Sequence, residues 1–216
     1  MSLWQEFITH KGRGVGKWSQ YFFPYERHFS RWKNTSLTFL EIGVASGGSV
    51  QMWQNYFGPN ATIIGVDVMH SCKEFESPNV HIRIGDQSDP NFLDSLVSEF
   101  GVPDVILDDG SHQQNHVIQT FNYFYPKMHK NGVYMVEDLH TSYWPEYGGG
   151  LQNPNTFMEY TKTNIDKLNA VHWRQPYQED VITNETLAIS VYDSVVCYEK
   201  GNVSWKKPIN ISPSQK

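Results

Sequence analysis

The chain has 216 residues, of which 39% are hydrophobic and 19% are charged, and these proportions are typical of one folded domain with a sizeable core. The net charge of −6 argues against nucleic acid as a partner, because phosphate backbones attract basic surfaces. No apolar run reaches the ~18 residues that a membrane-spanning helix needs, and the first residues lack the apolar core of a signal peptide. We therefore expect a cytoplasmic protein without nucleic-acid or membrane partners; a homo-oligomer is compatible with the sequence.

From residue 37 onwards, short apolar runs alternate with amphipathic stretches. "LTFLEIG" (37–43) is typical of a buried strand that ends in a glycine turn, and residues 48–57 repeat apolar side chains along one helical face. The next predicted elements are strands at 61–68 and 79–86 and a helix at 90–101, which opens with proline and closes on glycine, as helices prefer.

The same alternation continues through the second half of the chain. The predicted elements are a strand at 103–110, a helix at 113–128, a strand at 133–138, a helix at 154–170, and two final strands at 187–193 and 195–201. The last two are close enough to pair as antiparallel neighbours. Strands that alternate with helices predict an α/β fold, in which a mostly parallel sheet carries helices on both faces.

Acidic residues stand at the carboxyl ends of the five predicted parallel strands. They are Glu41, Asp67, Asp86, Asp108, Asp109, Glu137 and Asp138. Ligands of open α/β sheets bind beyond these strand ends. Core stability does not explain such a pattern, whereas a binding site for a cationic or hydroxylated ligand does.

The stretch "EIGVASGGS" (41–49) lets the backbone turn tightly after the first strand and approach a ligand closely. Its glycines follow a GxxxGG spacing. The alternative to a ligand-binding turn is a plain connection between a strand and a helix. Asp67 ends the second strand 24 residues after Gly43, where a carboxylate accepts hydrogen bonds from a ribose diol. Asp86 and Gln87 end the third strand, where they can hydrogen-bond an adenine edge or simply form a polar turn.

Both NAD and S-adenosylmethionine satisfy these requirements, so an oxidoreductase and a methyltransferase are the two candidates. S-adenosylmethionine carries a sulfonium and an ammonium group, which an acidic rim attracts. A dinucleotide carries a pyrophosphate, which the same rim repels. The charge balance therefore favours methyl transfer.

Three acids, Asp109, Glu137 and Asp138, end two strands that we predict to be neighbours. Carboxylates that converge on one point repel one another unless a cation lies between them. Because hard oxygen ligands without cysteine suit Mg²⁺ (or Mn²⁺) better than zinc, we predict a magnesium site. His112 lies in the loop after Asp109, beside this site, whereas His116, one helical turn later, is expected to be exposed on its helix.

The motifs "DDGSH", "VED" and "TSYWPEYGGG" resemble those of the metal-dependent sugar O-methyltransferases of macrolide antibiotic biosynthesis, the mycinamicin-type enzymes. The resemblance extends through "EIGVASGGSVQMW", "IIGVDV", "GDQSD" and "YEKGN", and so covers about residues 38–203. It implies the Rossmann-like class I methyltransferase fold, with a mostly parallel seven-stranded sheet and an antiparallel C-terminal strand. The family also carries an additional N-terminal domain, and its members tend to have "TDK" where this chain has "THK" at residues 9–11.

The resemblance implies that Asp109, Glu137 and Asp138 hold Mg²⁺ and that His112 is the general base. The residues that we expect to hold S-adenosylmethionine are Glu41, Gly43, Ser46, Gly47, Ser49, Asp67, Asp86, Gln87 and Asp108. We divide the chain into an N-terminal cap segment (1–36) and a methyltransferase catalytic domain (37–216).

The expected reaction is a magnesium-dependent transfer of a methyl group to a hydroxyl of a small molecule, a sugar or glycosylated natural product. A catechol-like diol as acceptor and a nucleotide-binding oxidoreductase on a similar fold remain as alternatives. Residues 139–153 are rich in aromatics and end in three glycines, which suits a mobile lid over the acceptor. An ordinary surface loop explains them equally well.

Overall fold

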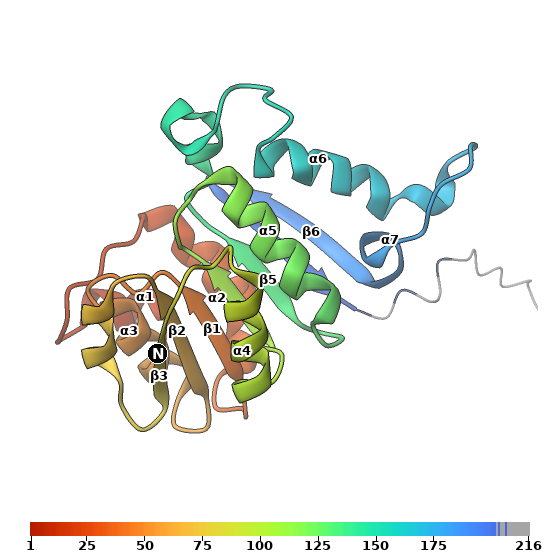
Figure 1. The fold of residues 1–216 in the computed structure, drawn as a ribbon. Helices are drawn as coiled ribbons and strands as arrows, with labels where there is room; N and C mark the ends of the chain where they lie inside the picture. The colour runs from red at the N-terminus through yellow and green to blue at the C-terminus, as the bar shows by residue number, and fades with distance from the viewer. Residues whose placement is uncertain (202, 204–205, 207–216) are drawn as a thin grey trace, which may run out of the picture.

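The computed structural model of the protein describes residues 1–201, 203 and 206, and a seven-stranded sheet forms its centre (Figure 1). The strands are β1 (Thr38–Ile42), β2 (Thr62–Asp67), β3 (Val80–Ile84), β4 (Val105–Asp108), β5 (Val133–Val136), β6 (Thr186–Tyr192) and β7 (Val195–Lys200). Their order across the sheet is β3-β2-β1-β4-β5-β7-β6, and β7 is antiparallel to both of its neighbours. The other pairs are parallel, which confirms the predicted fold class.

Helices cover both faces of this sheet because successive strand residues point to opposite sides. Phe39 lies in the cluster that packs under α2 and α3, whereas its neighbour Leu40 lies in the cluster under α4, α5 and α6. The α-helices are α1 (Leu3–Ile8), α2 (Phe22–Phe29), α3 (Gly48–Phe57), α4 (Pro90–Phe100), α5 (Gln114–Phe124), α6 (Phe157–Leu168) and α7 (Val181–Glu185). None of the helices in the described part of the chain has the length and apolar character needed to cross a bilayer.

Seven short 3₁₀ helices among the described residues connect these elements, and two predicted helices are shorter than expected. They are η1 (Ser19–Tyr21), η2 (Ser30–Trp32), η3 (His70–Phe75), η4 (Tyr125–Lys127), η5 (Leu139–Tyr143), η6 (Pro145–Tyr147) and η7 (Ala170–His172). Helix α5 gives way to η4 after Phe124, because Pro126 has no N–H with which to continue the α-helix. Helix α6 begins after Thr156, whose hydroxyl accepts a hydrogen bond from the backbone N–H of Glu159.

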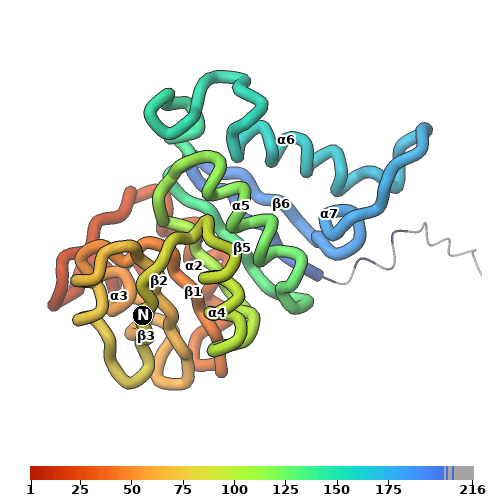
Figure 2. The backbone as a smooth tube through the Cα atoms, in the orientation of Figure 1, coloured from red at the N-terminus to blue at the C-terminus, as the bar shows by residue number. Residues whose placement is uncertain are grey.

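The first 36 residues pack on the face of the sheet that α3 covers. Tyr21, Tyr25 and Phe29 are fully buried there, and the Tyr25 ring meets the Trp53 ring edge to face at 5.2 Å. Figure 2 traces this segment in red and orange beside the strands. The division into a cap and a catalytic domain stays a prediction, and the end of the predicted domain, residues 207–216, lies outside the described residues.

Candidate active site

The candidate site lies where the strand order reverses, between β1 and β4, with β5 beside them. Backbone hydrogen bonds continue past the strand ends: Asp109 N–H donates to the Ile42 carbonyl over 2.9 Å, and Glu137 N–H donates to the Asp108 carbonyl over 3.1 Å. The acids after β4 and β5 are therefore held side by side by the sheet itself.

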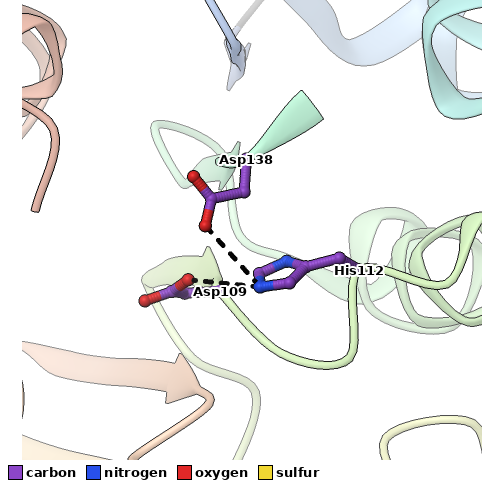
Figure 3. Close-up of side chains that lie close together, drawn as sticks. All are labelled: Asp109, His112 and Asp138. Carbon is purple, nitrogen blue, oxygen red and sulfur yellow. Dashed lines mark ion pairs between the residues drawn. The ribbon is translucent and has the colours of Figure 1, made fainter. Parts of the chain in front are cut away.

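Asp109, His112 and Asp138 form the centre of the site (Figure 3). The Nε2 atom of His112 lies 3.6 Å from Asp138 Oδ2 and 3.9 Å from Asp109 Oδ1. One ligand atom from each residue lies within 4.8 Å of the other two, so the group is able to hold a metal ion. His112 and Asp138 both have left-handed backbones, with φ of 58° and 56°, where the loops turn sharply after β4 and β5.

Glu137, the third predicted metal ligand, lies outside the group that surrounds His112. Its carboxylate is buried, and it accepts hydrogen bonds from the Lys17 ammonium over 2.7 Å and from the Tyr25 hydroxyl. Burial raises its pKa well above the ordinary value, Asp109 adds to this rise, and Lys17 opposes it. The structure thus brings Asp109 and Asp138 together around His112 and directs Glu137 towards Lys17.

Lys17 is the residue of the site that the sequence interpretation missed. Its side chain is only 2% exposed, and Nζ lies 2.5 Å from Asp109 Oδ2 and 3.8 Å from Glu41 Oε1. It belongs to a segment without helical or strand periodicity, so its position depends on tertiary contacts alone. The closely spaced glycines of "KGRGVGKW" (11–18) were the only available signal that this segment passes close to other backbone.

Glu41 is a residue of β1 and has no exposed surface. It accepts hydrogen bonds from Ser49 Oγ over 2.8 Å and from Trp53 Nε1 over 2.9 Å. Burial raises its pKa to about 7, although the neighbouring Lys17 ammonium opposes the rise. Glu41 therefore ties the start of α3 to the acidic centre.

Two adjoining cavities, which share Gly43, Asp67 and Gly110, open beside the acids. One of them, which we name the methyl-side cavity, is also lined by Ser46, Ser49, Asp109, His112 and residues 14–17. The other, which we name the base-side cavity after the adenine base that we expect there, is also lined by Val68, Asp86, Gln87, Ser111 and His116. Six of the nine predicted cofactor residues thus line these cavities, whereas Glu41, Gly47 and Asp108 line neither of them.

Asp67 is held rigidly between the two cavities. Its Oδ2 atom accepts hydrogen bonds from the backbone N–H groups of Val44 and Ala45, each over 3.0 Å, and Oδ1 accepts one from Met69. Burial alone would raise its pKa, but these backbone hydrogen bonds outweigh that effect and lower the pKa. The carboxylate is therefore kept charged at the position that we predicted for a ribose contact.

Gln87 and Asp108 hold each other under the base-side cavity. Gln87 donates to both carboxylate oxygens of Asp108, over 3.1 and 3.3 Å, and accepts a hydrogen bond from Ser111 N–H over 2.7 Å. Burial raises the pKa of Asp108 to about 7. Their polar groups in this structure thus bind the loop after β4.

The expectation that His116 is an exposed helix residue was wrong: it is half-buried, and Nδ1 lies 3.1 Å from Ser111 Oγ.

Residues 139–153 fold into η5 and η6 above α5, the teal segment at the top of Figure 2. Their backbone is tied internally, because Gly149 N–H donates to the Trp144 carbonyl and Gly150 N–H to the Ser142 carbonyl, each over 2.9 Å. Ser142 Oγ donates to Gln114 of α5 over 2.8 Å. The segment is a folded surface element in this structure, and its movement as a lid stays a prediction.

An arc of aromatic rings borders the acidic centre, and we call it the aromatic arc. It runs from Trp18 through His140, Trp144 and Tyr147 to His112, with successive ring centroids 5.9, 4.7, 6.1 and 6.2 Å apart. Trp18 and Trp144 are 57% and 43% exposed. A further cavity, lined by Trp18, Tyr21 and the acids Asp109, Glu137 and Asp138, opens next to this arc.

The chain is similar to known sugar O-methyltransferases, although no protein-family profile matches it. It is 37% identical over 166 residues to 8-demethyl-8-alpha-L-rhamnosyl tetracenomycin-C 2'-O-methyltransferase of Streptomyces olivaceus. The matched region covers 72% of this chain and 43% of that protein. It is 32% identical over 191 residues to mycinamicin VI 2''-O-methyltransferase of Micromonospora griseorubida, with 82% and 47% covered. The chain thus spans about half the length of the curated relatives that it matches.

The same likeness is found among solved structures. The methyltransferase MycE from the mycinamycin biosynthetic pathway, in complex with Mg, SAH and mycinamycin VI, superimposes with a TM-score of 0.82 at 30% sequence identity. That match covers 99% of this chain and 56% of MycE. Together, the strand order, the position of the site and these similarities show that the chain belongs to the family of class I S-adenosylmethionine-dependent O-methyltransferases.

Proposed function

We propose that this chain transfers a methyl group from S-adenosylmethionine to a hydroxyl of a sugar in a glycosylated natural product, with Mg²⁺ (or Mn²⁺) as the metal. The observation that carries the proposal is the position of Asp109 and His112, which belong to the metal-competent group and also line the methyl-side cavity. A proton acceptor and a cation site therefore border the place where the cofactor would lie. The named functions of the relatives and the Mg and SAH of the MycE complex support the same reaction.

The residues of the two cavities suit S-adenosylmethionine. The charged Asp67 carboxylate faces both cavities, where a ribose diol would donate to it. Ser46 and Ser49 line the methyl-side cavity, and Asp86 and His116 line the base-side cavity, where an adenine ring would lie. The surrounding acids favour the sulfonium and ammonium groups of this cofactor over the pyrophosphate of NAD.

The donor set of the acidic centre suits a hard divalent cation, because carboxylate oxygens are the ligands that Mg²⁺ prefers. Asp109 and Asp138 would hold it, and Glu137 would join them. A cation bound there stabilises negative charge on the oxygen of an acceptor hydroxyl. Since imidazole is a poorer partner for Mg²⁺ than oxygen, we assign His112 the role of general base rather than ligand.

The chain's own residues then carry the proton and fix the geometry. His112 Nε2 would accept the proton of the acceptor hydroxyl as the hydroxyl oxygen attacks the methyl carbon and the S–CH₃ bond of S-adenosylmethionine breaks, so that S-adenosylhomocysteine leaves. Asp109 Oδ1 and Asp138 Oδ2 lie 3.9 and 3.6 Å from Nε2, so the imidazole stands beside the place where the cation would lie. Holding the hydroxyl and the methyl donor in line supplies much of the remaining rate.

The aromatic arc is the proposed acceptor surface. Aromatic side chains beside a few polar groups are what binding sites for small organic molecules present. Within the arc, the exposed Trp18 lines the cavity of the acids, and the exposed Trp144 packs against His140. The relatives are named for rhamnosyl tetracenomycin and mycinamicin substrates, which favours a sugar over a catechol-like diol. We further propose that the protein acts in the cytoplasm, with no nucleic-acid or membrane partner, and that it is able to form a homo-oligomer.

The test uses the purified chain, methyl-labelled S-adenosylmethionine, and a panel of glycosylated and catecholic acceptors. We expect label in a sugar hydroxyl, loss of transfer in excess EDTA, and recovery when Mg²⁺ is added. Full activity in excess EDTA would rule out the metal role. Label found only in catechols would show that the acceptor is a catechol-like diol rather than a sugar. A calorimetric titration that shows binding of NAD but not of S-adenosylmethionine would replace methyl transfer by the oxidoreductase.

A further inference from the structure

Lys17 lies between two of the three acids that the proposed function assigns to the metal, Asp109 and Glu137. Its ammonium nitrogen is 2.5 Å from Asp109 Oδ2 and 2.7 Å from Glu137 Oε1. These are charge-assisted hydrogen bonds of short length, made by a side chain that is 2% exposed. The ammonium group thus bridges Asp109 and Glu137 as a bound cation would.

The carboxylate oxygens of Glu137 are both occupied in this arrangement. Oε1 accepts from Lys17 and Oε2 accepts from the Tyr25 hydroxyl. Asp109 divides its oxygens in the same way, with Oδ2 towards Lys17 and Oδ1 towards His112. Glu137 is therefore able to join Asp109 and Asp138 around a divalent ion only if Lys17 or Tyr25 moves away.

Tyr25 is the less mobile of these two partners. It is fully buried in α2, and its ring contacts those of Phe29 and Trp53. Lys17 instead belongs to the arm, as we name residues 12–18, where every residue except Val15 and Lys17 is exposed.

The arm is held at only a few points. Arg13 N–H donates to Gln51 Oε1 over 3.2 Å, and the Arg13 guanidinium lies over the Phe75 ring. No backbone hydrogen bond is found within the described chain for residues 14–17. A Cβ atom added at Gly14 or Gly16 would meet nothing within 4 Å, although the Gly14 carbonyl packs against Gly48. A segment with so few fixed contacts is able to move without disturbing the core.

We propose that Lys17 is a built-in counter-cation that competes with the divalent metal for Asp109 and Glu137, so that metal binding displaces the Lys17 ammonium and releases the arm. This inference rests on the proposed metal site. The arm also lines the methyl-side cavity, through residues 14–17. Its release therefore links occupancy of the metal site to access to that cavity.

The first experiment measures the reactivity of Lys17 in the wild-type protein. A water-soluble acetylating reagent is applied with and without saturating Mn²⁺, and each lysine is quantified by mass spectrometry. Lys17 should be protected without metal and should react at least about tenfold faster with Mn²⁺, whereas the exposed Lys11 should react equally in both. Lys17 that stays protected at saturating Mn²⁺ would overturn the proposal.

The second experiment titrates Mn²⁺ by electron paramagnetic resonance into the wild type, Lys17→Met, and the matched control Lys11→Met, which removes the same charge from a neighbouring exposed position. Lys17→Met should bind Mn²⁺ about ten- to a hundredfold more tightly, because the ion no longer has to break charged hydrogen bonds. Equal or weaker binding by Lys17→Met would refute the competition and leave the metal site standing. If neither the wild type nor Lys17→Met binds Mn²⁺, the metal role in the proposed function fails as well.

Discussion

Replacement of Gly43 by alanine tests whether the loops after β1 and β4 meet through their backbones. Gly43 has a φ of 95°, and a Cβ atom there would lie 1.9 Å from the carbonyl oxygen of Asp109. A backbone oxygen is unable to rotate away, so one of the two loops has to shift. Gly101→Ala is the matched control, because Gly101 has a φ of 77° and nothing within 4 Å of its added Cβ.

The two variants share backbone strain but differ in steric overlap. A non-glycine residue in such a backbone conformation costs about 1–3 kcal/mol, which applies to both. Overlap in a packed region adds about 1–3 kcal/mol at Gly43 only. The free energy of unfolding should therefore fall by about 2–6 kcal/mol in Gly43→Ala and by about 1–3 kcal/mol in Gly101→Ala.

Urea unfolding followed by tryptophan fluorescence measures this difference, and calorimetry measures the affinity for S-adenosylmethionine. Because Gly43 lines both cavities, its variant should also bind the cofactor at least about tenfold more weakly, whereas Gly101→Ala should bind it normally. Equal losses of stability in the two variants, with equal affinities, would show that the loops do not touch as described.

Three further predictions concern the acidic centre and the aromatic arc. His112→Asn, chosen because asparagine tolerates a left-handed backbone, should lower turnover about 10²–10⁴-fold without changing the affinity for S-adenosylmethionine; a loss of Mn²⁺ affinity would instead make His112 a ligand. The pKa of Glu41 is raised to about 7 in the folded protein. The stability that its protonated form contributes is therefore complete below about pH 4.5, the pKa of the unfolded chain, and is lost as the pH rises through 7. Glu41→Gln should remove this fall, on the order of 3 kcal/mol, from urea unfolding measured across that range; an unchanged pH profile would contradict the assignment. Trp144→Ala should raise the KM for the acceptor and leave the cofactor affinity unchanged, and an unaltered KM would exclude the aromatic arc from the acceptor site.

Local patterns were sufficient to predict the sheet, and they are clearest in the two fully buried strands, where a short apolar run ends at acids. "VILDDG" and "VYMVED" fold as β4 and β5, with the second acid of the first pair and both acids of the second just beyond the strand ends. Where the predicted helices are too long, single residues explain the difference, since Pro126 ends α5 and Thr156 caps α6. The apolar pattern alone does not record such events.

The contacts of the site were less accessible to sequence reasoning, because they depend on segments that are far apart in the chain. Lys17 meets Glu137 across 120 residues, and no periodicity or motif marks that encounter. His116 was misjudged because its helical position does not show that the loop carrying Ser111 folds back against it. Strand ends were predictable from the sequence, whereas the orientation of side chains around them was not.

The charge around the site favours a cationic ligand next to the acids that follow β4 and β5. Three carboxylates, those of Glu41, Asp109 and Glu137, lie within 4 Å of the single ammonium group of Lys17, and a fourth, that of Asp138, lies beside His112. Two like charges 4 Å apart repel by about 4 kcal/mol at an effective dielectric constant of 20, and the raised pKa values of Glu41 and Glu137 show that burial and this repulsion favour their protonated forms. A divalent ion and a sulfonium would remove the excess negative charge, whereas a pyrophosphate would increase it. The same surplus of acids that destabilises the metal-free site therefore selects a cationic cofactor.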